Sequence, residues 1–174
     1  CLPINSYQLL NTARKAGVNL SIIESSRKIN EKMPEHVVEL ATDAFKECNK
    51  TIQGSDILIL GISYKPDVKD IQLTPAENII KKLKDLGANI HIYDPYFSLT
   101  NVFGINTEEN LETTTLKKMD AAIIVTGHEE FKNFTISNFR LMRNPILIDT
   151  RGVFDPVEAK NAKLIFRGLG RGQS

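Results

Sequence analysis

Two patterns of hydrophobic positions divide the chain into two parts. Apolar residues recur at helical spacing through residues 5–50, whereas residues 55–167 alternate short apolar runs with helical stretches. In the first part, one helix is predicted to end at Gly17 and a second at Met33, since the residue before a proline avoids helical backbone angles. A third helix is expected to begin at Pro34, because proline suits a first helical position.

The third predicted helix has a single apolar stripe, which must be buried against another surface. The following domain and a second subunit are the two candidates. We expect a two-fold dimer, because a C2 contact is the commonest closed interface in soluble oligomers. The stripe consists of Val37, Ala41, Ala44, Phe45 and Cys48.

Short runs rich in Ile, Leu and Val mark the second part, and such runs are typical of strands covered on both faces. Helical stretches separate them. This alternation predicts an α/β fold with an open, mainly parallel sheet and helices on both sides. The runs lie at residues 56–61, 89–94, 121–127 and 145–149, with a fifth candidate at 163–166.

The stretch TPAENIIKKLKDLG is the clearest helix. Thr74 and Glu77 have the spacing of a capping box, Pro75 stands at the first helical position, and Gly87 ends the stretch. Its expected buried face comprises Ile79, Ile80, Leu83 and Leu86.

Residues that follow the strands are the candidates for function, because ligands of open parallel sheets bind beyond the carboxyl ends of the strands. Lys65 follows the first strand beside Tyr64. It either meets a phosphate or sugar oxygen or is an ordinary exposed loop lysine. Arg151 follows the fourth strand, where its guanidinium either grips a phosphate or pairs with Asp149 or Asp155.

Two further residues at strand ends have simpler interpretations. Asp94 stands where a Rossmann fold places a ribose-binding acid, but the first strand lacks the G-x-G-x-x-G turn, so a plain Asp-Pro turn is favoured. His128 is interpreted as a loop histidine with its hydrogen bonds satisfied. No Cys/His spacing indicates a metal site.

Composition narrows the classes of partner. The net charge of +1 argues against nucleic acid or a membrane surface, and no apolar run approaches the ~20 residues that span a bilayer. The only cysteines, Cys1 and Cys48, suit a reducing cytosol rather than a disulfide framework. A start on cysteine suggests that a natural N-terminal part precedes this chain.

Several segments, taken in order, resemble the C-terminal part of the UDP-glucose/GDP-mannose dehydrogenase family, and within it the UDP-N-acetyl-mannosamine dehydrogenases. They are CLPINSYQLL, GISYKPDVKDIQLTPAENIIKKLKDLGANIHIYDPY, LIDTRGVF and the tail FRGLGRG. The resemblance implies that residues 1–52 form a central helical dimerisation region and residues 53–174 a Rossmann-like UDP-binding domain. It also implies an NAD-dependent parent enzyme, a homodimer that oxidises a UDP-sugar and binds NAD mostly through a preceding domain.

The resemblance also assigns roles to single residues. Cys1 would be the nucleophile: its thiolate adds to the aldehyde that a first hydride transfer to NAD+ produces, and a second transfer gives a thioester that water releases as the acid. Tyr64 and Lys65 match a pair that contacts the nucleotide sugar. Arg151 matches an arginine that contacts UDP, in some members across the dimer.

Three positions depart from the UDP-glucose members of the family. Ile4 replaces a lysine near NAD, Asn5 replaces an aspartate associated with the catalytic water, and Gln72 replaces an arginine that approaches NAD. Asn5 can orient water by hydrogen bonds, but it cannot act as a general base at neutral pH. We expect the chain alone to bind UDP weakly, to bind no NAD and to be inactive.

Two other classes of protein share the predicted fold. One is a stand-alone nucleotide-binding or regulatory module that lacks the chemistry. The other is a receiver-like signalling domain, whose acidic phosphoacceptor cluster is missing here because the first and third strands end on Gly61 and Gly127.

Overall fold

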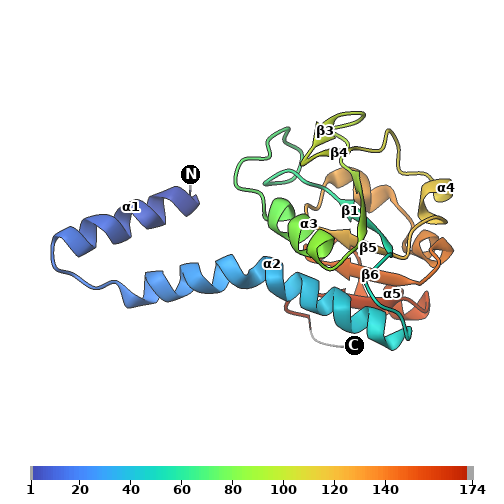
Figure 1. The fold of residues 1–174 in the computed structure, drawn as a ribbon, viewed down its shortest axis with the longest axis horizontal. Helices are drawn as coiled ribbons and strands as arrows, with labels where there is room; N and C mark the ends of the chain where they lie inside the picture. The colour runs from blue at the N-terminus through green and yellow to red at the C-terminus, as the bar shows by residue number, and fades with distance from the viewer. Residues whose placement is uncertain (1, 172–174) are drawn as a thin grey trace.

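The computed structural model describes residues 2–171, which are built around a five-stranded parallel sheet (Figure 1). Neighbouring strands lie in the order β2-β1-β5-β6-β7, and every adjacent pair is parallel. The predicted α/β class, the parallel sheet and all five predicted strands are confirmed. The strands are β1 (Asp56–Leu60), β2 (Asn89–Tyr93), β5 (Ala121–Ile124), β6 (Ile146–Asp149) and β7 (Ile165–Gly168).

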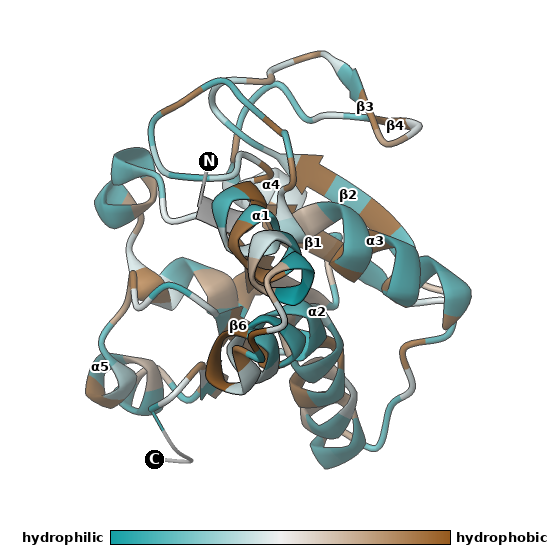
Figure 2. Ribbon diagram, turned by 90° about the vertical axis from the view of Figure 1, so that its left-hand side faces the viewer, coloured by the Kyte–Doolittle hydropathy of each residue, from teal (hydrophilic) through white to brown (hydrophobic). Residues whose placement is uncertain are grey.

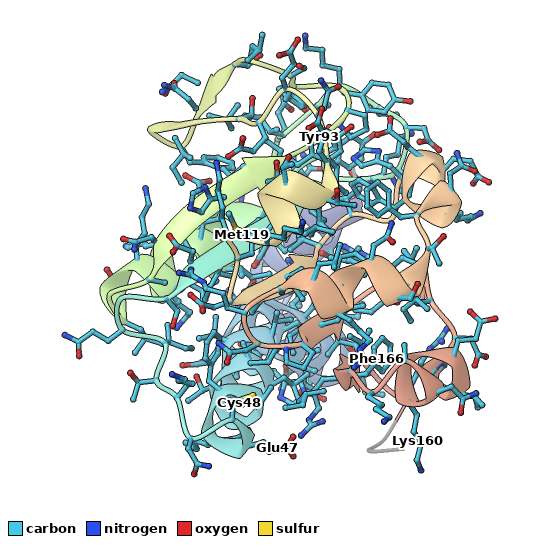
Figure 3. The ribbon with its side chains drawn as sticks, turned by 90° about the vertical axis from the view of Figure 1, so that its right-hand side faces the viewer. Glu47, Cys48, Tyr93, Met119, Lys160 and Phe166 are labelled. Carbon is cyan, nitrogen blue, oxygen red and sulfur yellow. The ribbon has the colours of Figure 1, made fainter. Side chains whose placement is uncertain are left out.

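Helices cover both faces of the sheet. Strand side chains alternate between the faces, so Ile57 and Ile59 pack on one side and Leu58 and Leu60 on the other. The first face is covered by α2 (Ser21–Glu47) and α3 (Pro75–Asp85). The second is covered by α4 (Thr113–Leu116), η1 (Glu129–Asn133), η2 (Ile136–Leu141) and α5 (Pro156–Asn161). Met119 and Phe166, labelled in Figure 3, belong to the core under this second layer.

The prediction of a helix break at Pro34 is wrong. Helix α1 (Leu2–Lys15) ends before Gly17 as predicted, but α2 runs without interruption through Pro34. A proline inside a helix removes one backbone hydrogen bond and crowds the preceding turn. The continuous helix is explained by its second half, whose buried face packs against the sheet and holds the helix in place.

The apolar stripe of α2 contacts the chain's own sheet. Val37 and Phe45 lie in one core cluster with strand residues such as Ile57, and Cys48 packs at its margin. The following domain is therefore the partner of the stripe, and the prediction of a dimer through Val37 and Phe45 is wrong. Other large apolar side chains remain exposed on α1, the following turn and the first half of α2, which extend away from the sheet in Figure 1: Ile4, Tyr7, Leu9, Val18, Ile22 and Ile29.

Helix α3 matches its prediction with two differences. The Thr74 hydroxyl accepts a hydrogen bond from Ala76 N–H at 3.2 Å, but the Thr74 N–H donates to Ile71 O rather than to Glu77, so only half of the capping box forms. Leu86, expected to be buried, follows the last helical residue and is 46% exposed. Figure 2 shows hydrophobic residues along β2 and hydrophilic residues on the outward side of α3.

A short antiparallel hairpin follows β2 and was not predicted. It consists of β3 (Asn101–Val102) and β4 (Ile105–Asn106), which are too short to give a period-two pattern in the sequence.

Candidate functional site

The direction of winding changes between β1 and β5. From β1 the chain crosses to β2 on one side and later returns to β5 on the other. Open α/β sheets bind their ligands outside the carboxyl ends of the strands at such a switch point. Gly61 follows β1 here in the left-handed region, with φ at 79°, and a Cβ atom on it would lie 2.5 Å from Thr126 O. The two strand ends therefore approach so closely that only glycine fits.

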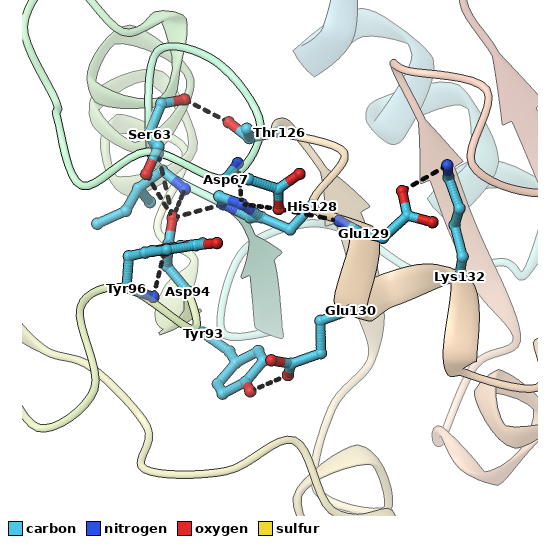
Figure 4. Close-up of polar contacts among 11 residues, drawn as sticks. Ser63, Asp67, Tyr93, Asp94, Tyr96, Thr126, His128, Glu129, Glu130 and Lys132 are labelled. Carbon is cyan, nitrogen blue, oxygen red and sulfur yellow. Dashed lines mark hydrogen bonds and ion pairs between the residues drawn. The ribbon is translucent and has the colours of Figure 1, made fainter.

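A buried carboxylate and a buried imidazole occupy this switch point (Figure 4). One oxygen of Asp94 accepts hydrogen bonds from Ile62 N–H (2.8 Å), from Ser63 N–H (3.2 Å) and from the Ser63 hydroxyl (3.1 Å). The same oxygen lies 3.0 Å from His128 Nε2. The other oxygen accepts from Tyr96 N–H at 2.9 Å, which makes the predicted turn at Asp94.

The pKa of Asp94 lies below its ordinary value. Burial alone raises the pKa, but the hydrogen bond from His128 and those from the Ile62 and Tyr96 N–H groups outweigh it. Asp94 is thus an ionised carboxylate whose acceptor positions are occupied. Asp94 therefore does not have the free carboxylate oxygens that ribose binding in a Rossmann fold requires.

His128 connects Asp94 to the loop that follows β1. Its Nδ1 atom lies 3.0 Å from the backbone nitrogen of Asp67, which can only donate. The proton of the neutral ring is therefore on Nε2, where it is donated to Asp94. The prediction of a loop histidine with satisfied hydrogen bonds is confirmed.

Tyr64 and Lys65 lie together on this loop. Lys65 Nζ is 5.5 Å from the centroid of the Tyr64 ring, and Tyr64 is 41% exposed. The Tyr64 N–H donates to Asp70 O at 2.9 Å and closes the base of the loop. Among residues 2–171, Lys65 has no ion-pair partner, so its charge is available to a ligand.

Arg151 lies on a turn that a second buried aspartate holds. Asp149 accepts hydrogen bonds from the N–H groups of Arg151 (2.9 Å), Gly152 (2.8 Å) and Phe154 (2.9 Å). This arrangement sets the direction in which the chain leaves β6 and fixes the position of Arg151 at the carboxyl edge of the sheet.

The Arg151 side chain does not form the ion pairs that were considered for it. Its Nε donates to Val125 O at 2.7 Å. Asp149 instead accepts a hydrogen bond from the backbone N–H of Arg151. Asp155 caps α5 by accepting from the N–H groups of Val157 and Glu158. The terminal guanidinium nitrogens have no carboxylate partner within the described part of the chain.

A cavity of about 660 Å³ lies between Arg151 and the helical region. Arg27 of α2 also lines it, with its guanidinium carbon 4.9 Å from the Tyr7 ring centroid. The Arg27 Nε is buried without a hydrogen-bond partner. Two guanidinium groups therefore line one cavity. The sequence pattern missed Arg27 because it looks like any polar residue of an exposed helix.

The predicted site residues do not all line this cavity: Tyr64 and Lys65 are not among its lining residues. Ile4 lines the same cavity as Arg151. Asn5 is exposed on α1, and Gln72 is exposed with its N–H bonded to Asp70 Oδ1 at 2.8 Å; neither lines the cavity. Cys1 lies outside the described residues.

The turn after β1 does not fit a dinucleotide. In an NAD-binding turn, backbone N–H groups at this position and the following helix start receive the pyrophosphate. Here Asp94 already occupies the N–H groups of Ile62 and Ser63, and Gln72 offers no charge. The turn after β1 therefore has no free pair of N–H groups for the pyrophosphate of a dinucleotide.

Two other kinds of site are not found in residues 2–171. No group of three or more His, Cys, Asp or Glu side chains there has the arrangement of a metal site. None of the helices in that range is both long enough and apolar enough to cross a membrane.

These features define an α/β domain in which two cations at the carboxyl edge of the sheet, Lys65 and Arg151, lack carboxylate partners among residues 2–171. The model of the UDP-glucose/GDP-mannose dehydrogenase family, UDP binding domain, matches residues 58–156. The chain belongs to this family, as its ordered segments predict.

Known relatives extend the similarity over nearly the whole chain. UDP-glucose 6-dehydrogenase TuaD of Bacillus subtilis is 30% identical over 98% of this chain and 37% of its own length. UDP-N-acetyl-D-mannosamine dehydrogenase of Pyrococcus horikoshii is 31% identical over 99% of this chain and 38% of its own length. This chain therefore spans less than two fifths of the length of either of these relatives.

Solved structures give the same result. The UDP-D-ManNAc dehydrogenase of Pyrococcus horikoshii superposes with a TM-score of 0.84 at 30% identity, over 100% of this chain and 38% of that one. The NDP-N-acetyl-D-galactosaminuronic acid dehydrogenase of Methanosarcina mazei also gives 0.84, at 26% identity, over 96% of this chain and 37% of that one.

Proposed function

We propose that this chain is the UDP-sugar-binding part of an NAD-dependent UDP-sugar dehydrogenase. The observation that carries the proposal is a pair of cations, Lys65 and Arg151, that lack carboxylate partners within residues 2–171 at the ligand edge of a domain of this family. A diphosphate is the anion that such side chains bind well, and arginine can do so with two parallel hydrogen bonds. Tyr64 offers a flat face to the sugar or base.

The rest of the parent enzyme is assigned by resemblance. Residues 1–52 would form the dimerisation region with the cysteine element, and residues 53–174 the UDP-binding domain. Cys1 would act as nucleophile and Asn5 would orient water. NAD would be held mostly by protein outside residues 2–171, with Gln72 at the margin of its site. We place this enzyme in the reducing cytosol because the chain has only two cysteines.

The homodimer is proposed through a different surface from the one first predicted. Ile22 and Ile29 of α2 are 81% and 65% exposed and stand seven residues apart, on the same side of the helix. A surface of this kind is typical of a contact between subunits. The buried stripe with Val37 and Phe45 supports the sheet instead.

The test is titration calorimetry of the 174-residue chain with UDP. A charge-assisted hydrogen bond contributes roughly 1.5–3 kcal/mol, so Arg151→Ala and Lys65→Ala should each weaken UDP binding by about one to two decades. Lys118→Ala removes the same charge near the start of β5, at the opposite edge of the sheet, and should leave the affinity unchanged. NAD should give no heat. An absence of UDP binding, or affinity unaffected by both variants, would contradict the proposal.

A further inference from the structure

We propose that Asp94 and His128 act as a positioning pair, which fixes the loop of residues 62–70 so that Tyr64 and Lys65 are held ready for the ligand. This inference rests on the proposed UDP site. It adds two residues that do not touch the ligand themselves and act through Lys65.

The attachments lie on both sides of the exposed tip. Before it, the N–H groups of Ile62 and Ser63 donate to Asp94. After it, the N–H of Asp67 donates to His128 Nδ1. Since His128 in turn donates to Asp94, one buried carboxylate holds both ends of the tip directly or through the imidazole (Figure 4).

Within the tip itself, the Tyr64 N–H donates to Asp70 O at 2.9 Å. Tyr64 and Lys65 are exposed, and the Lys65 ammonium lies 5.5 Å from the centroid of the Tyr64 ring. Asp67 has φ at 59°, in the left-handed region that costs free energy in a residue other than glycine. The bond to His128 offsets that cost, as does the Asp67 carboxylate, which accepts from Glu129 N–H at 3.2 Å.

Fixing the loop in advance favours binding. A lysine on a mobile loop has to be ordered when the ligand arrives, and this ordering weakens the affinity. The pair removes part of this entropic cost before the ligand binds. Burial keeps water from competing for the bonds, because both side chains have 0% exposure.

Two substitutions at His128 separate the arms of the pair. In His128→Gln, the amide nitrogen still reaches toward Asp94, but no acceptor remains for the Asp67 N–H. In His128→Asn, the amide oxygen lies near the former Nδ1 position and restores that acceptor. We expect UDP to bind about tenfold more weakly to the Gln variant. The Asn variant should recover only part of the loss, since it restores the acceptor for the Asp67 N–H but not the bond to Asp94. Ser63→Ala removes one bond to Asp94 without touching His128, and should weaken UDP by about threefold.

A double-mutant cycle with Lys65 distinguishes positioning from general stability. If His128 acts through Lys65, then His128→Gln should cost no further affinity once Lys65 is alanine. Amide hydrogen exchange should rise within residues 62–70 and stay unchanged in β5 and β6. Urea unfolding shows which variants are folded, and Ser63→Ala carries the test if both His128 variants unfold.

Specific outcomes would overturn the proposal. One is UDP affinity equal to that of the wild type in both His128→Gln and Ser63→Ala. The other is an affinity loss in the double variant equal to the product of the losses from His128→Gln and Lys65→Ala. A wild-type chain that binds no UDP would refute the proposed function instead. Amide hydrogen exchange in residues 62–70 would then test the positioning role of Asp94 and His128 without any ligand. Unchanged exchange in both His128→Gln and Ser63→Ala would overturn that role.

Discussion

Two buried aspartates accept hydrogen bonds from backbone N–H groups at the two turns that carry Lys65 and Arg151. Asp94 accepts from the N–H groups of Ile62 and Ser63, just before Lys65, and Asp149 accepts from those of Arg151 and Gly152. Backbone N–H groups at strand ends are the usual anion-binding groups of α/β folds. Because these carboxylates occupy the N–H groups of Ile62, Ser63, Arg151 and Gly152, we assign anion binding at this edge to the side chains of Lys65 and Arg151 as part of the proposed function.

Gly61 is the residue on which the switch point depends most directly. In Gly61→Ala, the new Cβ would lie 2.5 Å from Thr126 O and the residue would still require φ near 79°. Strain of both kinds should lower the free energy of unfolding by about 3 kcal/mol or more. Urea denaturation measures the loss.

Gly104→Ala is the matched control for Gly61. Its φ is 73°, but nothing lies within 4 Å of the place that an added Cβ would take, so only the backbone cost of about 1 kcal/mol applies. Equal losses in the two variants would show that contact with Thr126 does not matter.

At the scale of the elements, the sequence predicted what depends on local pattern. The strands were found because short runs of Ile, Leu and Val between helical stretches are typical of sheets covered on both faces. The continuity of α2 through Pro34 could not be found this way. Proline favours a break locally, and only the packing of the following residues on a sheet that forms later in the chain shows that the helix continues.

The candidate site was predictable to a similar extent. Lys65 and Arg151 were predicted as ligand-binding residues because parallel strands place their carboxyl ends at one edge, and both follow strand ends in the structure. The pairing of Asp94 with His128 joins residues 34 positions apart through the register of three strands. No local pattern encodes such a contact, and each residue by itself has an ordinary interpretation as part of a turn or loop.

The exposed face of α2 leads to a prediction about assembly. Replacing Ile22 and Ile29 together by glutamate should convert dimers into monomers, since both side chains are largely exposed in the single chain and charge opposes their burial between subunits. Sedimentation velocity measures the oligomeric state.

Phe45→Ala is the contrasting variant. It should lower the free energy of unfolding by about 3–5 kcal/mol and leave the oligomeric state unchanged, because Phe45 has 0% exposure within the chain's own core. Dimers that persist in the glutamate variant would exclude this surface.

Across the whole molecule, ionised aspartates are anchored at both edges of the sheet. Asp94 lies at the carboxyl edge, and Asp56 lies at the amino edge beside Arg143 and His91. Burial raises the pKa of Asp56, but hydrogen bonds from Arg143 and His91 outweigh it, and the pKa lies below its ordinary value. The folded state therefore prefers both groups ionised more strongly than the unfolded chain does.

This preference predicts how stability depends on pH. A carboxyl group with a depressed pKa contributes stability that is complete above its unfolded pKa, about 3.9 for aspartate, and is lost as the pH falls through the lower folded value. The free energy of unfolding should thus fall from about pH 4 downward.

Asp94→Asn should be less stable than the wild type at pH 7 but should lose less stability on acidification, because position 94 no longer takes up a proton on unfolding. Asp56→Asn should behave in the same way with a smaller effect, since that side chain is 27% exposed whereas Asp94 is fully buried. Urea unfolding at pH 7, 4 and 3 compares the slopes, and an acid slope in Asp94→Asn equal to that of the wild type would mean that His128 and the loop N–H groups do not stabilise the ionised carboxylate.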